Sequence, residues 1–293
     1  ILDHEERIVA VLVGRPVESD QRKQEDRWEA AAERAADLFE AVRASDPEAF
    51  PPPVEHRRGV YSCVNVGISH GGGSKAPHNT SLGSPSRAAL VQLLLDNLDV
   101  QRLAGFASGA LAAYYPKAYQ DMCEALASLY ERQPELLSNF RNSAYPMATF
   151  NLGPETVTFE HNDCKNYPSL PCAITALGRF NPDKGGQLYL RDLRLKIRFP
   201  SGSTILLPSA GLRHGNSAIQ AGERRYSMTQ YCLGELMRWV RHGFRPAGSL
   251  SKAERGRVDS GRWAAQLGRL SKLSELAGDR LKLKEWEMRM SKA

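Results

Sequence analysis

The chain has 293 residues, of which 42% are hydrophobic and 25% are charged, and its formal net charge is +6. This composition is typical of a globular protein with a substantial buried core. No run of 18 apolar residues occurs, which argues against a membrane-spanning helix, and the N-terminal stretch is too charged for a signal peptide. We therefore expect a soluble, intracellular protein without a membrane partner.

The five cysteines favour a reducing compartment. Their number is odd and no Cys-x-x-Cys pair occurs, so they fit neither a disulfide framework nor a zinc site. The cytosol or the nucleus is the expected location.

The positive charge is concentrated toward the C-terminus. From residue 235 onward there are 14 Lys and Arg against 7 Asp and Glu, whereas the preceding residues carry 25 against 26. Such a tail can contact phosphates regardless of base sequence, because each neutralised phosphate releases condensed counterions. A solvated amphipathic helix explains the pattern equally well, and Trp263, Leu267, Leu270 and Leu273 or Ser274 recur at the spacing of a packed helix face. The charge therefore permits a nucleic-acid partner without demonstrating one.

The first half of the chain has mainly helical patterning. Residues 20–45 carry apolar side chains at helical spacing, and the prolines at 51–53 that follow cannot continue a helix. Residues 60–68 predict a strand, and the Gly-, Pro- and Ser-rich residues 70–86 predict a long loop. Helical patterning returns over residues 86–134, with breaks expected near Gly105 and Pro116.

Short β-rich runs separated by turn-forming residues follow residue 144. They cover residues 156–161, 172–180, 186–199, 203–209 and 225–233. Strands at this spacing without intervening helices favour an antiparallel sandwich or jelly roll. We therefore predict an α+β fold, with a β-barrel core buttressed by helices. Its expected parts are an N-terminal helical segment packed on the core (1–60), the core domain (61–248) and a basic helical extension (249–293).

A His-x-Asp pair ends the first of these runs. Alternation along a strand puts the side chains of His161 and Asp163 on one face, and His214 can supply a third ligand after the run at 203–209. Two histidines and one carboxylate form the facial triad of non-haem iron oxygenases, which leaves positions open for substrate and oxygen. His-x-Asp alone is common by chance, and the alternative is a hydrogen-bonded loop pair.

A pair suited to binding a carboxylate follows His214. Arg225 and Ser227 alternate onto one face of the last run, where arginine can bind a carboxylate through two parallel hydrogen bonds and serine can add a third. The order His-x-Asp, His and Arg-x-Ser on strands fits a 2-oxoglutarate-dependent dioxygenase. We therefore expect Fe(II), O₂ and the co-substrate 2-oxoglutarate, whose far carboxylate would meet Arg225.

Longer segments carry a resemblance to a known family. They are NSAYPMATFNLGPETVTFEHNDCKN, CAITALGRFNPDKGGQLYLRDLRLKIRFPSGSTILLPSAGLRHGN and GERRYSMTQYCLGELMRWVRHGF, together with the loop HGGGSKAPHN. Over about residues 61–244 the chain closely resembles the fungal branch of the TET/JBP dioxygenases. The resemblance implies a double-stranded β-helix that uses Fe(II), O₂ and 2-oxoglutarate to oxidise 5-methylcytosine in double-stranded DNA. It also implies a hydroxymethyl product, further oxidation to formyl and carboxyl, and a nuclear location; we expect a monomer.

The resemblance assigns the iron and co-substrate residues one by one. His161, Asp163 and His214 match the iron ligands, and Arg225 matches the arginine that binds 2-oxoglutarate. Arg224 is the rival for that role. Arg225 is preferred because the family's arginine is followed two residues later by a small hydroxyl residue, as Ser227 is here.

The resemblance also implies residues that contact the base. Tyr231 matches an aromatic that stacks on the flipped base, and Asn166 and Asn79 match polar positions at the base edge. Gly71, Gly72 and Gly73 would let the backbone approach or wedge into the vacated stack. Because an asparagine amide both donates and accepts, the pocket could also take N6-methyladenine.

Other interpretations remain open at this stage. Tyr231 could be an ordinary sheet aromatic, and Asn79 and Asn166 could form turns. The triad and Arg225 do not identify the substrate, so a dioxygenase acting on a protein or small molecule is one alternative. A catalytically inactive DNA-binding module is the other, although the sequence retains every expected iron ligand.

Overall fold

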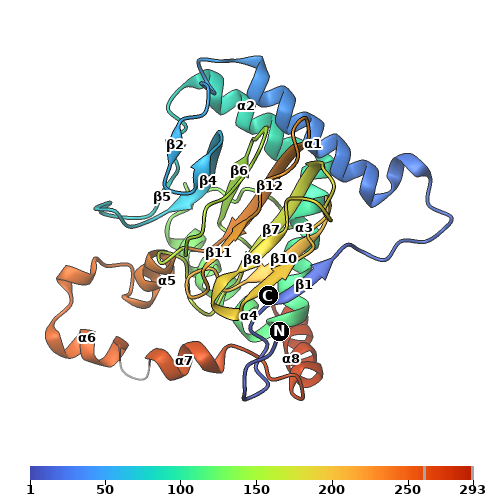
Figure 1. The fold of residues 1–293 in the computed structure, drawn as a ribbon. Coiled ribbons are helices and arrows are strands. Elements are labelled where there is room, and N and C mark those ends of the chain that lie inside the picture. Colours follow the sequence, from blue (N-terminus) through green and yellow to red (C-terminus); the bar gives the residue numbers. More distant parts are fainter. Residues whose placement is uncertain (260–261, 292–293) are drawn as a thin grey trace.

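A seven-stranded antiparallel sheet forms the centre of the computed structural model, which describes residues 1–259 and 262–291 (Figure 1). In spatial order the strands are β1 (Val11–Gly14), β10 (Thr204–Leu207), β7 (Cys172–Arg179), β12 (Arg224–Tyr231), β6 (Met147–Asn151), β4 (Cys63–Ser69) and β5 (His78–Asn79). A three-stranded sheet has the order β11 (His214–Asn216), β8 (Leu188–Leu190) and β9 (Leu195–Ile197), and β2 (Glu55–His56) pairs with β3 (Gly59–Val60). The two larger sheets form a double-stranded β-helix, as predicted.

Helices surround this core. The α-helices are α1 (Trp28–Ser45), α2 (Pro85–Asp96), α3 (Leu98–Tyr114), α4 (Pro116–Arg132), α5 (Gly234–Arg241), α6 (Lys252–Asp259), α7 (Arg262–Gly268) and α8 (Leu276–Met290). Short 3₁₀ helices cover Gln24–Asp26, Arg191–Leu193 and Ala247–Ser249. Within residues 1–259 and 262–291, no helix has the length and apolarity needed to cross a membrane.

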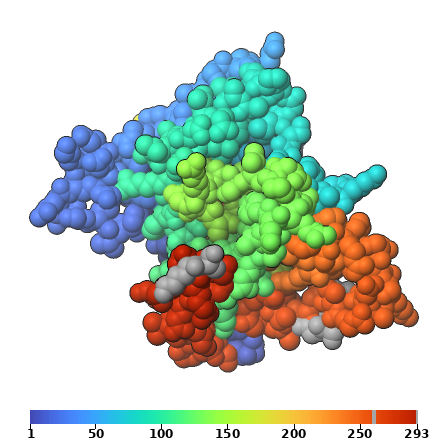
Figure 2. All heavy atoms as spheres, turned by 180° about the vertical axis from the view of Figure 1, so that it is seen from behind, coloured from blue at the N-terminus to red at the C-terminus, as the bar shows by residue number. Residues whose placement is uncertain are grey.

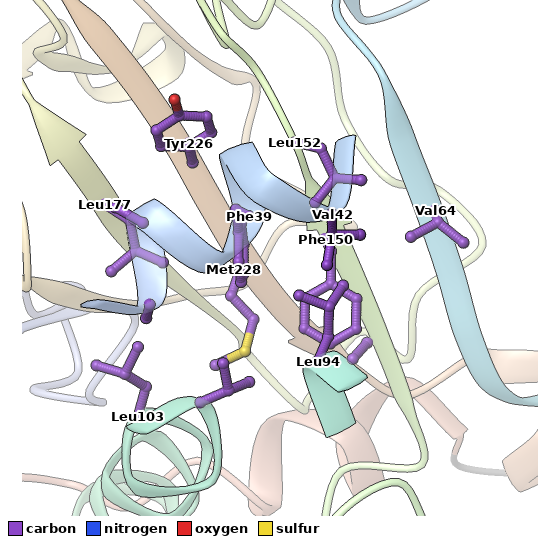
Figure 3. Packing of buried hydrophobic residues seen from close by; sticks show 14 of the residues in the cluster. Phe39, Val42, Val64, Leu94, Leu103, Phe150, Leu152, Leu177, Tyr226 and Met228 are labelled. Carbon is purple, nitrogen blue, oxygen red and sulfur yellow. The ribbon is translucent and has the colours of Figure 1, made fainter. Parts of the chain in front are cut away.

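Helices α1, α2 and α3 cover the outer face of the large sheet (Figure 3). Phe39 of α1 packs edge-on against Phe150 of β6, with ring centroids 5.4 Å apart, and Met228 of β12 lies in the same cluster. Each large apolar side chain buried here contributes roughly 1.5–3 kcal/mol. Because strand side chains alternate, Tyr226 and Met228 face these helices while Arg225, Ser227 and Tyr231 face the cavity inside the β-helix.

The helix break predicted near Gly105 is wrong. The chain breaks at Asn97, whose side chain caps α3 by accepting from the backbone N–H groups of Asp99 and Val100, whereas Pro116 starts α4 as expected. Gly105 lies inside α3, where a Cβ would approach the Asn142 Nδ2 to 2.5 Å. This glycine therefore allows close packing and does not end the helix.

Two strand predictions also need correction. Residues 156–161 form no ladder strand, and their one isolated bridge joins His161 to His214. Strands β1 and β6 escaped prediction, although β6 is paired along its whole length between β12 and β4.

The two ends of the chain are joined to the core and to each other. Strand β1 pairs with β10, the Ile8 N–H donates to the Ser271 carbonyl at 3.0 Å, and the Leu273 N–H donates to the Glu6 carbonyl at 3.0 Å. The domain boundaries at residues 60 and 248 stay predictions. The expected single apolar helix face of the tail is wrong, because α7 ends at Gly268 and Trp263 is 70% exposed, although Leu270 packs against the core.

Candidate iron and co-substrate site

The structure brings the three predicted iron ligands together. His161 and Asp163 lie on the extended segment beside β11, and His214 is the first residue of β11. The Asp163 carboxylate lies 3.6 Å from the His161 Nε2 and 3.9 Å from the His214 Nε2. All three ligand atoms lie within 4.8 Å of one another, and the side chains are at most 9% exposed. This is a cluster that can hold one metal ion.

Backbone pairing sets the distance between the two histidines. The His161 N–H donates to the His214 carbonyl at 3.0 Å, and the His214 N–H donates to the His161 carbonyl at 2.9 Å. Gly215 permits this pairing, because a Cβ there would lie 2.7 Å from the Thr158 carbonyl oxygen. Glycine is therefore required at position 215 so that the two backbone segments can approach each other closely.

Each histidine has one ring nitrogen engaged with the backbone. The His161 Nδ1 lies 2.8 Å from the Phe159 carbonyl, and the His214 Nδ1 lies 2.9 Å from the Leu212 carbonyl. A carbonyl can only accept, so each Nδ1 carries the proton and each Nε2 offers its lone pair to a metal. Burial lowers the pKa of His161 to about 4 and also lowers the pKa of His214. Both rings are therefore neutral at physiological pH, as metal ligands must be.

Arg58 is a residue of this site that the sequence did not reveal. Its guanidinium donates to the Asp163 carboxylate from the turn between β2 and β3, and both residues line the same cavity. The Asp163 N–H donates to the Ser209 carbonyl at 2.8 Å, which fixes the backbone of this ligand. Arg58 and Asp163 are 105 residues apart in sequence, and no local pattern marks the arginine.

Arg225 lies in the same cavity with a guanidinium that is only partly hydrogen-bonded. It is 2% exposed, its Nη1 donates to the Thr156 carbonyl at 3.0 Å, and its Nε has no hydrogen-bond partner. In the part of the chain that the structure describes, no carboxylate forms an ion pair with it. Burial lowers the pKa of Arg225 to about 10, so it is still charged at neutral pH. A buried cation without a counter-ion is costly, and an anionic ligand would relieve that cost.

These residues fit Fe(II), 2-oxoglutarate and O₂. His161, Asp163 and His214 provide the two imidazoles and one carboxylate that suit Fe(II) and leave positions for O₂ and a chelating co-substrate. Arg225 is a buried cation in the same cavity, and the far carboxylate of 2-oxoglutarate could pair with it. Arg224, by contrast, is exposed and donates to the Glu223 carbonyl.

A second, larger cavity of about 870 Å³ adjoins the site. Asn166 and Tyr231 line both cavities, so they mark the junction. The far walls of the larger cavity are the loop after β4 and helix α7. This cavity is named the groove below. Its lining carries five Lys and Arg and one carboxylate: Lys165, Arg238, Arg241, Arg262, Arg269 and Glu235.

Comparisons with known proteins concern the fold. No protein-family model matches the sequence, and no curated protein matches it. The structure is similar to NgTET1 in complex with 5mC DNA, with TM-score 0.48 and 16% identity over 68% of each chain. It is also similar to an oxidoreductase of the 2OG-Fe(II) oxygenase family from Burkholderia pseudomallei, with TM-score 0.36 and 16% identity over 72% of this chain and 93% of that one. For the collagen prolyl hydroxylase vCPH of Paramecium Bursaria Chlorella virus-1 in its 2OG complex, the TM-score is 0.22, with 17% identity over 30% of this chain and 57% of that one. These similarities do not place the chain in a fungal branch.

The residues predicted to contact a base lie in different surroundings. Asn166 is buried and its Nδ2 donates to the Ser209 Oγ at 2.9 Å, and the Tyr231 hydroxyl lies 3.4 Å from the Thr149 Oγ1. Asn79 is exposed and lines neither cavity. Its Nδ2 donates to the Glu135 carbonyl and its Oδ1 accepts from the Leu137 N–H, so its role at a base edge stays a prediction.

The remaining predicted residues flank these two cavities. The Ser227 Oγ accepts from the Asn151 Nδ2 at 2.9 Å inside the iron and co-substrate cavity. Gly71 and Gly72 line the groove, whereas Gly73 is not part of its lining. The glycine-rich loop therefore borders the groove, and its contact with DNA stays a prediction.

Proposed function

We propose that this protein is an Fe(II)- and 2-oxoglutarate-dependent dioxygenase that oxidises the methyl group of 5-methylcytosine in double-stranded DNA. One observation carries the oxygenase part: the unpaired, buried guanidinium of Arg225 shares a cavity with His161, Asp163 and His214. A structural ion pair would have supplied a carboxylate for this arginine. An arginine that binds an exchangeable anion beside a metal has no protein carboxylate as its partner, as is the case for Arg225.

The groove supports a nucleic acid as the substrate. A methyl group in a duplex can be reached only when the nucleotide is extruded, at a cost of a few kcal/mol. The extruded base would enter past Asn166 and Tyr231, which line both the groove and the iron cavity. The cations of the groove lining complement the phosphates on either side of that base.

Each side chain has a distinct task in this proposal. Bound iron, together with 2-oxoglutarate and O₂, would supply the oxidising chemistry. Arg225 and Ser227 bind and orient the co-substrate, and the two imidazoles are held by the carbonyls that accept from their Nδ1 atoms. Ile174 and Leu188 give the cavity apolar walls that limit access of water.

Product analysis tests the proposal. Purified protein is incubated with Fe(II), 2-oxoglutarate and duplexes that carry 5-methylcytosine, N6-methyladenine or neither, and the nucleosides are measured by mass spectrometry. We expect hydroxymethylcytosine, then formyl and carboxyl products, with N6-methyladenine as a second substrate, and no product from Asp163→Ala. Equal succinate release with methylated and unmethylated duplex would point instead to a protein or small-molecule substrate. A wild-type protein that neither binds iron nor turns over any duplex would point to an inactive binding module.

A DNA substrate also implies where the protein acts. We propose that it is nuclear and acts as a monomer on double-stranded methylated DNA. Imaging of the tagged chain tests the location, and light scattering with and without a duplex tests the monomer. Exclusion from the nucleus would contradict the proposed substrate.

A further inference from the structure

Helix α7, in the C-terminal extension, is fixed against the core beside the base-entry point. The Arg269 Nε lies 2.9 Å from the Asp121 Oδ2, and the Arg241 Nη2 lies 2.8 Å from the same oxygen. Both guanidinium groups also lie over the Tyr167 ring, that of Arg241 at 5.1 Å and that of Arg269 at 6.0 Å from its centroid. Tyr167 directly follows Asn166 in the chain. The extension is therefore anchored on the residue next to the junction of the two cavities.

One face of α7 lines the groove. Arg262, Trp263 and Gln266, together with Arg269 just beyond the helix, recur at the spacing of a single helix face, and all of them belong to the lining. Gln266 is buried, whereas Trp263, one turn earlier, is 70% exposed. The anchoring contacts hold the C-terminal end of the face and leave an unburied indole at the other end. Figures 1 and 2 place α7 on the same side of the molecule as the loop after β4.

A strand of DNA fits these properties better than an apolar partner. The groove lining has five cations against one carboxylate, and positive charge is still in excess when Asp121, which pairs with Arg241 and Arg269, is counted with them; the groove therefore complements a polyanion. Tryptophan has a flat face on which any base can stack. The iron cavity opens into the same groove through Asn166 and Tyr231, so nucleotides next to an extruded base would pass along α7.

We propose that α7 forms one wall of the DNA-binding groove and that Trp263 stacks on a nucleotide beside the extruded base. This inference rests on the proposed function and names a residue that determines DNA affinity outside the iron site. It accounts for an exposed tryptophan in a wall that is otherwise tied to the core.

Fluorescence anisotropy with a labelled duplex containing one 5-methylcytosine tests this role. Trp263→Ala should weaken binding about 5- to 150-fold, because base stacking contributes roughly 1–3 kcal/mol and 1.4 kcal/mol is a factor of ten. Trp263→Phe should restore most of the affinity. The slope of log affinity against log salt should stay unchanged in both, since neither change removes a charge, whereas Arg262→Gln should reduce the slope by about one ion.

The control variant is Leu281→Ala, which removes an exposed apolar side chain from α8, outside the groove lining. It should bind the duplex like the wild type, and all variants should keep the wild-type melting temperature. Wild-type affinity in Trp263→Ala, while the wild type oxidises the duplex, would overturn the inference and leave the proposed function intact. A wild-type protein that neither binds nor oxidises methylated duplex would overturn the proposed function, and this inference with it.

Discussion

Replacing Arg225 by methionine should separate co-substrate binding from stability. The guanidinium is 2% exposed, and its pKa is lowered to about 10 from an ordinary value of 12.5. A shift of this size corresponds to about 3 kcal/mol of unfavourable burial of the charge. Methionine removes this unfavourable burial of a charge, but it also removes the hydrogen bond to the Thr156 carbonyl. We therefore expect the unliganded Arg225→Met protein to be more stable than the wild type by roughly 1–2 kcal/mol.

The same change should abolish tight binding of 2-oxoglutarate. Truncating one partner of a buried, charged hydrogen-bonded pair costs about 3–5 kcal/mol, which raises the dissociation constant roughly 10²- to 10⁴-fold. Thermal unfolding with Mn(II), with and without 2-oxoglutarate, measures both effects. The wild type should gain about 2.7 kcal/mol when the ligand is at 100 times its dissociation constant, and Arg225→Met should gain no more than about 0.4 kcal/mol at the same concentration.

The adjacent arginine provides the control. Arg224 is exposed, so Arg224→Met should leave the stability and the response to 2-oxoglutarate unchanged. If Arg224→Met lost the response while Arg225→Met kept it, our assignment of the co-substrate arginine would be refuted.

Three further predictions concern the metal ligands. Asp163→Ala should weaken Fe(II) or Mn(II) binding at least 100-fold by titration calorimetry, and near-native affinity would contradict the site. Burial lowers the pKa of His161 and His214 below 6.5, so in the metal-free protein protonating these rings costs folding free energy. The free energy of unfolding should therefore be highest above pH 6.5 and fall as the pH drops toward 4. Denaturant titrations that show stability rising over this range as the pH drops would contradict this. Gly215→Ala should cost about 1–3 kcal/mol and weaken metal binding, whereas Gly211→Ala, whose Cβ would lie 3.9 Å from its nearest neighbour, should do neither in the same assays.

The iron site could be predicted in outline because few residue types bind iron. His161, Asp163 and His214 stand out by chemistry and order, and the structure places them together even though the segment before His161 is no ladder strand. An extended segment with single bridges still alternates its side chains, so the argument from alternation does not need a strand. Arg58 could not be predicted, because only the folded chain brings it to Asp163.

The fold shows the same division between local and distant information. Pro116 predicts a helix start from its own backbone geometry. Gly105 predicts a helix break that does not occur, because its role is to allow contact with Asn142 of another segment. Strand β1 is only four residues long, and its partner β10 lies far along the chain. The exposure of Trp263 likewise depends on where α7 docks, which its spacing does not reveal.

The pairing of residues 6–8 with 271–273, together with that of β1 with β10, has a consequence for synthesis in the cell. Each pairing joins segments that the ribosome makes far apart in time, so residues 6–8 and β1 stay unpaired until their partners have been made. Until then their free N–H and C=O groups are a template for pairing with other chains. Pairing of these segments is therefore expected to be slow, and to be sensitive to whatever shields β1 until β10 has been made.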